Sequence, residues 1–90
     1  MNLKKNAGET MQMPITMQTN LVTLGKESRL EGNRFQIFLD GYKLFILDHP
    51  VPVLKKENSS PVGKAVIKEV AWKEDSTHLV YELIDLHGVN

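Results

Sequence analysis

The stretch between residues 62 and 86 constrains the fold of this chain more than any other. Apolar and β-branched residues fill two segments of it, on either side of a polar cluster at residues 74–77. Asp, Ser and Thr favour turns because their short side chains bond to nearby backbone. The stretch therefore predicts a long β-hairpin, which also contains the one Trp of the chain, Trp72. The remaining segments then require this hairpin as their packing partner.

A four-residue loop at residues 74–77 aligns apolar residues across the two strands of this hairpin. The expected pairs are Trp72 with Leu79, Val70 with Tyr81, Ile67 with Ile84, and Ala65 with Leu86. Such cross-strand pairs are the unit from which a sheet gains stability. The apolar phase shifts once on each strand, and a side-chain period of two cannot change face without an extra residue. We therefore expect β-bulges near residues 68–69 and 83–84.

A second hairpin is indicated by Asp40-Gly41, a dipeptide that favours a two-residue type I′ turn. The expected pairs are Leu39 with Tyr42, Ile37 with Leu44, and Phe35 with Ile46. One face of this hairpin is then wholly apolar. The other face carries Arg34, Gln36, Phe38, Lys43 and Phe45. Two Phe rings therefore stand on a face where polar residues are usual.

The other segments predict shorter or irregular strands. Apolar and polar residues alternate in residues 14–24, which indicates a strand that bends after Leu21. Residues 26–33 form a charged connection. Each Pro in residues 50–54 removes a backbone donor, which predicts an irregular segment at the edge of the sheet.

Together these segments predict an all-β fold, with about five strands in a small, strongly bent barrel or a rolled antiparallel sheet. The expected core comprises Ile15, Leu21, Phe35, Ile37, Leu39, Leu44, Ile46, Val70, Trp72, Leu79, Tyr81 and Ile84. Residues 1–12 lack periodicity and are expected to form a mobile N-terminal tail. Residues 13–90 are then a single β domain, which suits a chain of 90 residues.

Composition narrows the functional classes. Lys and Arg together number 11, as do Asp and Glu, so the formal net charge is zero. That balance argues against non-specific nucleic-acid binding, which needs clustered positive charge. The absence of Cys excludes disulfides and thiolate metal sites. No segment approaches the ~20 apolar residues of a membrane helix. We expect a soluble, cytoplasmic protein without membrane contact.

Three segments carry a family resemblance: LDHPVPVLKK at residues 47–56, PVGKAVIKEVAWKED at 61–75, and YELIDLHGVN at 81–90. With these segments the chain resembles the YtmB-like family, small uncharacterised proteins of Gram-positive bacilli. The resemblance spans roughly residues 13–90. It implies a compact, mostly β, cytoplasmic domain. It brings no assigned activity, cofactor or catalytic residue.

The sequence contains no convincing catalytic, cofactor or metal site. Asp85 and His87 lie two apart and would share a strand face, but a metal needs a third ligand, and His49 and His78 lie elsewhere in the chain. The hydroxyls of Ser59, Ser60, Ser76 and Thr77 lie in turn-like runs, where they usually bond local backbone. Gly63 lacks the glycine spacing of a phosphate loop and is expected to permit a turn or a close approach. We therefore expect no catalytic residue, cofactor or metal, and consider an enzyme the less favoured class.

The candidate partner surface comprises Phe38, Phe45 and Lys43. Exposed apolar patches mark contact sites, so these residues predict a non-enzymatic module that binds a protein partner or a second copy of the chain. Alternatively, the two rings belong to a second small core. A further possibility is a small-barrel nucleic-acid binder that uses Lys and aromatic residues, including Lys64, Lys68 and Lys73 of the long hairpin.

Overall fold

The computed structural model describes residues 15–86, and every regular element in this part of the chain is a β-strand, which confirms the all-β prediction. The strands are β2 (Ile15–Met17), β3 (Leu21–Val22), β4 (Ser28–Glu31), β5 (Arg34–Asp40), β6 (Tyr42–Leu44), β7 (Pro50–Leu54), β8 (Gly63–Lys73) and β9 (Ser76–Leu86). The expected tail at residues 1–12 lies outside the described residues.

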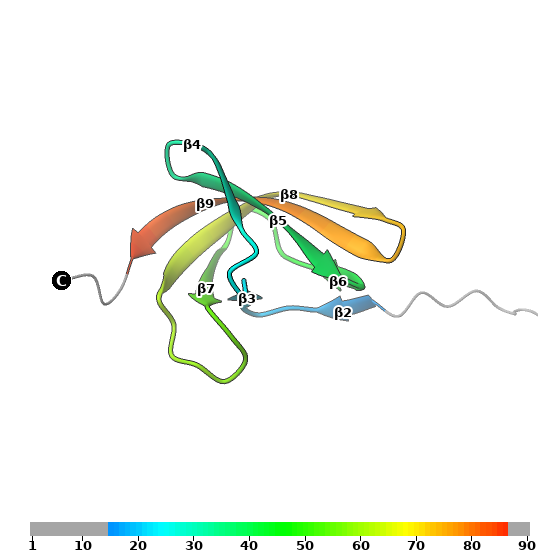
Figure 1. Cartoon of the computed structure of the whole chain (residues 1–90), viewed down its shortest axis with the longest axis horizontal. Coiled ribbons are helices and arrows are strands. Elements are labelled where there is room, and N and C mark those ends of the chain that lie inside the picture. Colours follow the sequence, from blue (N-terminus) through cyan, green and yellow to red (C-terminus); the bar gives the residue numbers. More distant parts are fainter. Residues whose placement is uncertain (1–14, 87–90) are drawn as a thin grey trace, which may run out of the picture.

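The strands form a six-stranded sheet in the order β3-β7-β8-β9-β5-β4 and a two-stranded sheet of β2 and β6. Most pairs are antiparallel, but β2 with β6 and β3 with β7 are parallel. The large sheet curves across the molecule, and β2 and β6 lie beneath it (Figure 1). Within residues 15–86 neither sheet closes on itself, so a five-stranded barrel is more specific than the architecture observed.

The hairpin of β8 and β9 is the longest element, and both predicted bulges are confirmed. Ile67 pairs with Tyr81, but the next pair joins Glu69 to Val80, which leaves Lys68 as the extra residue on β8. Near the other end, Ala65 pairs with Leu83 and Lys64 with Asp85, which leaves Ile84 as the extra residue on β9. Because a bulge bends its strand and increases the twist, these two residues curve the hairpin.

The turn of this hairpin contains two residues, and the predicted four-residue loop is wrong. Glu74 and Asp75 both have positive φ, 52° and 64°, as a type I′ turn requires. Trp72 therefore pairs with Thr77 instead of Leu79. The observed register therefore differs from the expected one by two residues. Trp72 lies close to the turn of the hairpin, where it is 41% exposed.

The predicted hairpin at Asp40-Gly41 is also wrong. β5 pairs with β4 on one side and β9 on the other, and β6 leaves this sheet to pair with β2. Gly41 does have positive φ, 81°, so the chain turns there as expected. Its amide, however, donates a hydrogen bond to the carbonyl of Asp75, on the turn of the other hairpin.

Three shorter segments also differ from expectation. The stretch 26–33 contains the strand β4 instead of a connection, and Gly32-Asn33 turns it back into β5. Residues 14–24 were expected to form one strand that bends after Leu21, but they divide into β2 and β3, with the break between Met17 and Leu21. The Pro-containing strand β7 lies between β3 and β8, yet β3 pairs only with Val53 and Leu54, beyond both Pro residues.

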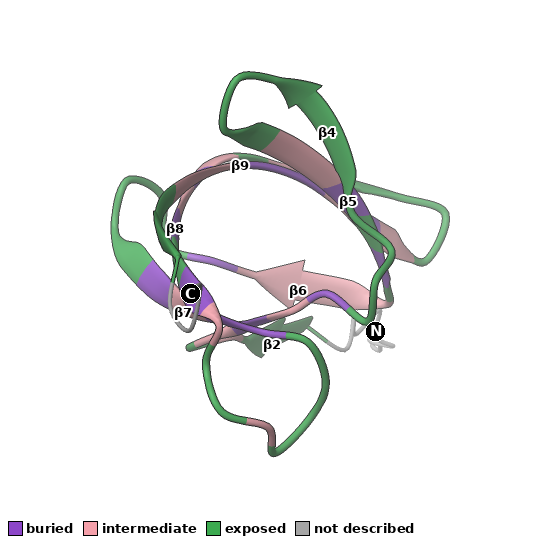
Figure 2. Cartoon of the chain, turned by 60° about the vertical axis from the view of Figure 1, so that its left-hand side comes forward, coloured by how far each residue is buried: buried purple, intermediate pink, exposed green. Residues whose placement is uncertain are grey.

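The core lies on the concave side of the large sheet, and Figure 2 shows its buried segments along β5, β7, β8 and β9. Its members are Leu21, Ile37, Leu39, Phe45, Val51, Val53, Ala65, Ile67, Leu79 and Tyr81. Four residues predicted in the core are instead exposed: Ile15, Ile46, Trp72 and Ile84. Phe45 takes the core position expected for Ile46. The expected alternation of inward and outward side chains assumed that β6 pairs with β5, and it does not.

Gly63 provides a test of the β8–β9 ladder. A Cβ at this position would collide with the backbone carbonyl oxygen of Asp85 on β9, which confirms the expected close approach. Since a carbonyl in a paired strand cannot move without breaking the ladder, we expect Gly63→Ala to cost about 3 kcal/mol of unfolding free energy. Urea denaturation measures this loss.

The neighbouring exposed residue Lys64 provides the matched control, and Lys64→Ala should change the stability by about 0.5 kcal/mol or less. Equal midpoints for Gly63→Ala and the unmodified chain would contradict the close approach.

Candidate functional site

The structure separates the two rings of the predicted partner surface. Phe38 points outward from β5 and is 59% exposed, whereas Phe45 belongs to the core and is 4% exposed. The shared outward face of Phe38 and Phe45 is therefore a wrong prediction. Lys43 is partly buried and lines a hollow with Phe45, away from Phe38. Of the three residues, Phe38 alone keeps the exposure that a contact surface needs, and its role in binding stays a prediction.

Phe38 is part of a small cluster on the convex side of the sheet, which we call the Phe38 face. Its ring stacks on His78, with 4.5 Å between ring centroids and 22° between planes, because the two residues are direct partners in the β5–β9 ladder. His78 Nε2 donates to Gln36 Oε1 at 3.0 Å. A shallow hollow of about 300 Å³ beside the rings also contains Ala71, Lys73 and Glu74. The stack holds an apolar ring rigidly in contact with water.

The backbone of Lys43 is anchored by two residues of the long hairpin. Its amide donates to Thr77 Oγ1 at 2.9 Å, and its carbonyl accepts from Trp72 Nε1 at 2.8 Å. Thr77 is fully buried and donates its own hydroxyl proton to the carbonyl of Gly41 at 2.7 Å. One threonine thus ties the start of β6 to β9.

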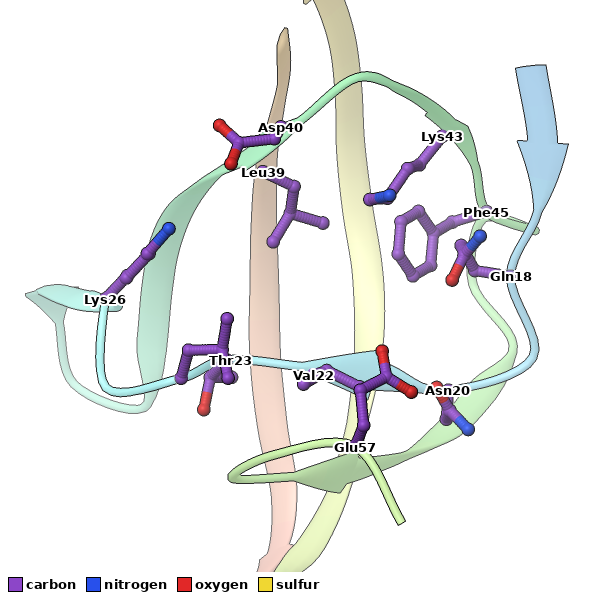
Figure 3. Close-up of a pocket in the computed structure, with 11 residues that line it drawn as sticks. Gln18, Asn20, Val22, Thr23, Lys26, Leu39, Asp40, Lys43, Phe45 and Glu57 are labelled. Carbon is purple, nitrogen blue, oxygen red and sulfur yellow. The ribbon is translucent and has the colours of Figure 1, made fainter. Parts of the chain in front are cut away.

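The hollow that Lys43 lines is small and electrically balanced. It measures about 220 Å³ and contains Leu39 and Phe45 on its floor. Figure 3 shows Lys43 beside the Phe45 ring and Lys26 directed towards Asp40, with Glu57 on the opposite rim. Two lysines and two carboxylates leave no net charge to select a ligand. The volume is also below the ~300–1,000 Å³ of typical small-molecule sites.

A larger hollow opens at the other side of Thr23, and we call it the Tyr81 pocket. It measures about 450 Å³ and lies between residues of β4, β5, β7 and β9. Phe35 and Tyr81 stack in it with centroids 5.6 Å apart and planes 15° apart. The Arg29 guanidinium lies 5.1 Å from the Phe35 ring centroid, in position for a cation–π interaction. Burial raises the pKa of the Tyr81 hydroxyl, and the carboxylate of Glu27 adds to the increase.

The Ser, Asp and His residues considered as catalytic or metal-binding candidates do not form a common site among the described residues. Ser59 and Ser76 donate to the carbonyls of Lys56 and Lys73, each at 2.7 Å, which confirms their local backbone roles. Asp85 pairs with Lys64 across the hairpin, and His87 lies outside the described residues. Between residues 15 and 86, no three His, Cys, Asp or Glu side chains are grouped as metal ligands would be. None of the elements described there is a helix long and apolar enough to cross a bilayer.

A family model described as "Domain of unknown function (DUF2584)" matches residues 11–90. The chain belongs to the DUF2584 family. This DUF2584 chain is 36% identical over 80 residues to the uncharacterized protein YtmB of Bacillus subtilis (strain 168), an alignment that covers 89% of this chain and all of YtmB. Its fold matches the X-ray crystal structure of YtmB with a TM-score of 0.84, over 89% of this chain and 99% of that one. The predicted resemblance to the YtmB-like family is confirmed.

Sequence reasoning missed the Tyr81 pocket of this DUF2584 chain. Tyr81 was assigned to the core and Arg29 to a connection, and nothing local joins them. The available signal was the Gly32-Asn33 dipeptide, which could have predicted a turn and therefore a strand before it. A strand at β4 places Arg29 beside Phe35.

Thr77 supplies a test of how β6 is positioned. We expect Thr77→Val, which keeps the shape but removes the hydroxyl, to cost about 1–3 kcal/mol, because the carbonyl of Gly41 and the amide of Lys43 both lose a buried partner. Thermal unfolding followed by circular dichroism measures the loss. Thr19→Val, at an exposed position, is the control and should be nearly neutral. Equal losses from both variants would contradict the anchoring role of Thr77.

Proposed function

We propose that this DUF2584 chain is a small, non-enzymatic interaction module that self-associates through the Phe38 face. The observation that carries the proposal is the exposed ring of Phe38, 59% accessible and stacked on His78. Aromatic residues at the centre of a contact contribute much of its binding energy, because a rigid ring loses little entropy when it is covered. A cytoplasmic location stays a prediction.

A second copy of the chain is the partner that the charges favour. The formal net charge is zero, so two copies do not repel each other as strongly charged proteins do. A two-fold contact brings the same patch of both copies together. Lys73 and Glu74 border the hollow beside Phe38, so each can face its opposite across the two-fold axis.

Nucleic-acid binding is the second candidate and has weaker support. It requires aromatic and basic side chains interleaved on one accessible surface. Phe45 is buried and Lys43 is partly buried, so neither contributes to such a surface. Beside Phe38, the charge of Lys73 is offset by Glu74.

Sedimentation velocity over a concentration series tests the proposal. The unmodified chain should dimerise as its concentration rises, whereas Phe38→Ser should remain monomeric because the contact loses its central ring. Leu30→Ser is the matched control, since Leu30 is 47% exposed on β4 but does not line the Phe38 hollow. It should dimerise as the unmodified chain does.

A monomeric unmodified chain, or a Phe38→Ser variant that still dimerises, would contradict self-association. Fluorescence anisotropy with a labelled single-stranded oligonucleotide tests the second candidate. Binding that weakens with salt and disappears in Phe38→Ser would favour the nucleic-acid function instead.

A further inference from the structure

We infer that the Tyr81 pocket binds a small organic monocarboxylate with an apolar body. This site is separate from the Phe38 face and does not depend on self-association. Its volume of about 450 Å³ falls within the ~300–1,000 Å³ range of small-molecule sites. Its lining is also of the usual kind, an apolar wall with a few polar groups at defined positions.

The first observation is an unpartnered buried hydroxyl. Tyr81 is only 3% exposed, and no group among residues 15–86 forms a hydrogen bond with its hydroxyl. Buried tyrosine hydroxyls usually have a partner, because leaving water without one is unfavourable. Tyr81 also lines the pocket, so a bound molecule can supply the missing acceptor. A tyrosine hydroxyl is protonated at neutral pH even at its ordinary pKa. Burial raises the pKa of this one further, so it is a donor at neutral pH.

The second observation is the charge at the rim. Arg29 and Lys55 both line the pocket, and Glu27 is the one acid among its lining residues. Within the described part of the chain, neither Arg29 nor Lys55 forms an ion pair. The rim therefore carries one net positive charge with both cations available. A guanidinium matches the two oxygens of a carboxylate, and that of Arg29 lies 5.1 Å from the ring centroid of Phe35, which also lines the pocket.

These two observations define the ligand chemistry. A carboxylate binds Arg29 and Lys55, while Glu27 disfavours a second negative charge on the ligand. The apolar body packs against Val62 and Leu83, which also line the pocket. A carbonyl, ether or carboxylate oxygen accepts the Tyr81 proton. Neutral apolar molecules leave the rim cations unpaired, and dianions meet the Glu27 carboxylate.

4-Phenylbutyrate and its neutral amide, 4-phenylbutyramide, are the probes, and two-dimensional amide NMR is the measurement. The carboxylate should produce saturable shifts at Arg29, Phe35, Lys55 and Tyr81. The amide has the same shape without the charge and should bind about tenfold more weakly or not at all. Arg29→Gln should weaken binding of the carboxylate about tenfold, whereas Lys64→Gln, outside the pocket, should leave it unchanged.

Tyr81→Phe tests the hydroxyl itself. The free variant should have an unfolding temperature equal to or higher than that of the unmodified chain, because it removes a buried group that has no partner. Its affinity for 4-phenylbutyrate should fall about fivefold or more. A lowered unfolding temperature would show that the hydroxyl is already bonded within the free protein and would overturn the inference.

Two further results would overturn it: non-saturable shifts with 4-phenylbutyrate, or equal affinities for the acid and the amide. Phe38→Ser should bind the carboxylate with unchanged affinity. Loss of the ligand in that variant would contradict the separation of the pocket from the Phe38 face.

Discussion

The two bulges in the β8–β9 ladder are the constraint on which the rest of the structure depends. Lys68 and Ile84 each add one residue to one strand, so the hairpin bends twice while its remaining residues stay paired. A flat hairpin of this length would expose one apolar face that 90 residues cannot cover. The bent hairpin instead turns its concave face inward, where β5 and β7 complete the core from either side. The curvature also leaves the hollows that open beside Thr23.

The direction of β6 depends on a side chain far away in the sequence. Thr77 captures the carbonyl of Gly41 and the amide of Lys43, so the chain leaves the large sheet at Gly41 instead of returning along β5. That departure buries Phe45 and exposes Ile46. One buried hydroxyl therefore contributes to the burial of Phe45. Among the Phe residues, all of which the structure describes, Phe38 is then the exposed one, and the Phe38 face lies apart from both hollows.

Sequence predicted what depends on local periodicity and failed where partners lie far apart. The apolar phase shift located both bulges, because each strand records its own change of face. Asp40-Gly41 correctly indicated a turn, but its partner is 36 residues further along the chain and leaves no local trace. Glu74-Asp75 adopt left-handed conformations that side chains other than Gly seldom take, so a two-residue turn was not expected. Phe38 was identified as outward because the alternation along its own strand indicates it. The Arg29–Phe35 contact was missed because it joins two different strands.

The fold requires the ring of Tyr81 but not its hydroxyl. The ladder places this residue between Ile67 on β8 and Phe35 on β5, and its ring stacks on that of Phe35. A phenylalanine would fill the same core position and stack on Phe35 equally well, without a hydroxyl to desolvate. Packing therefore accounts for the ring but not for the hydroxyl. A molecule bound in the pocket would supply the hydrogen-bond acceptor that the hydroxyl lacks. The unpaired cations at the rim of the pocket favour a carboxylate there.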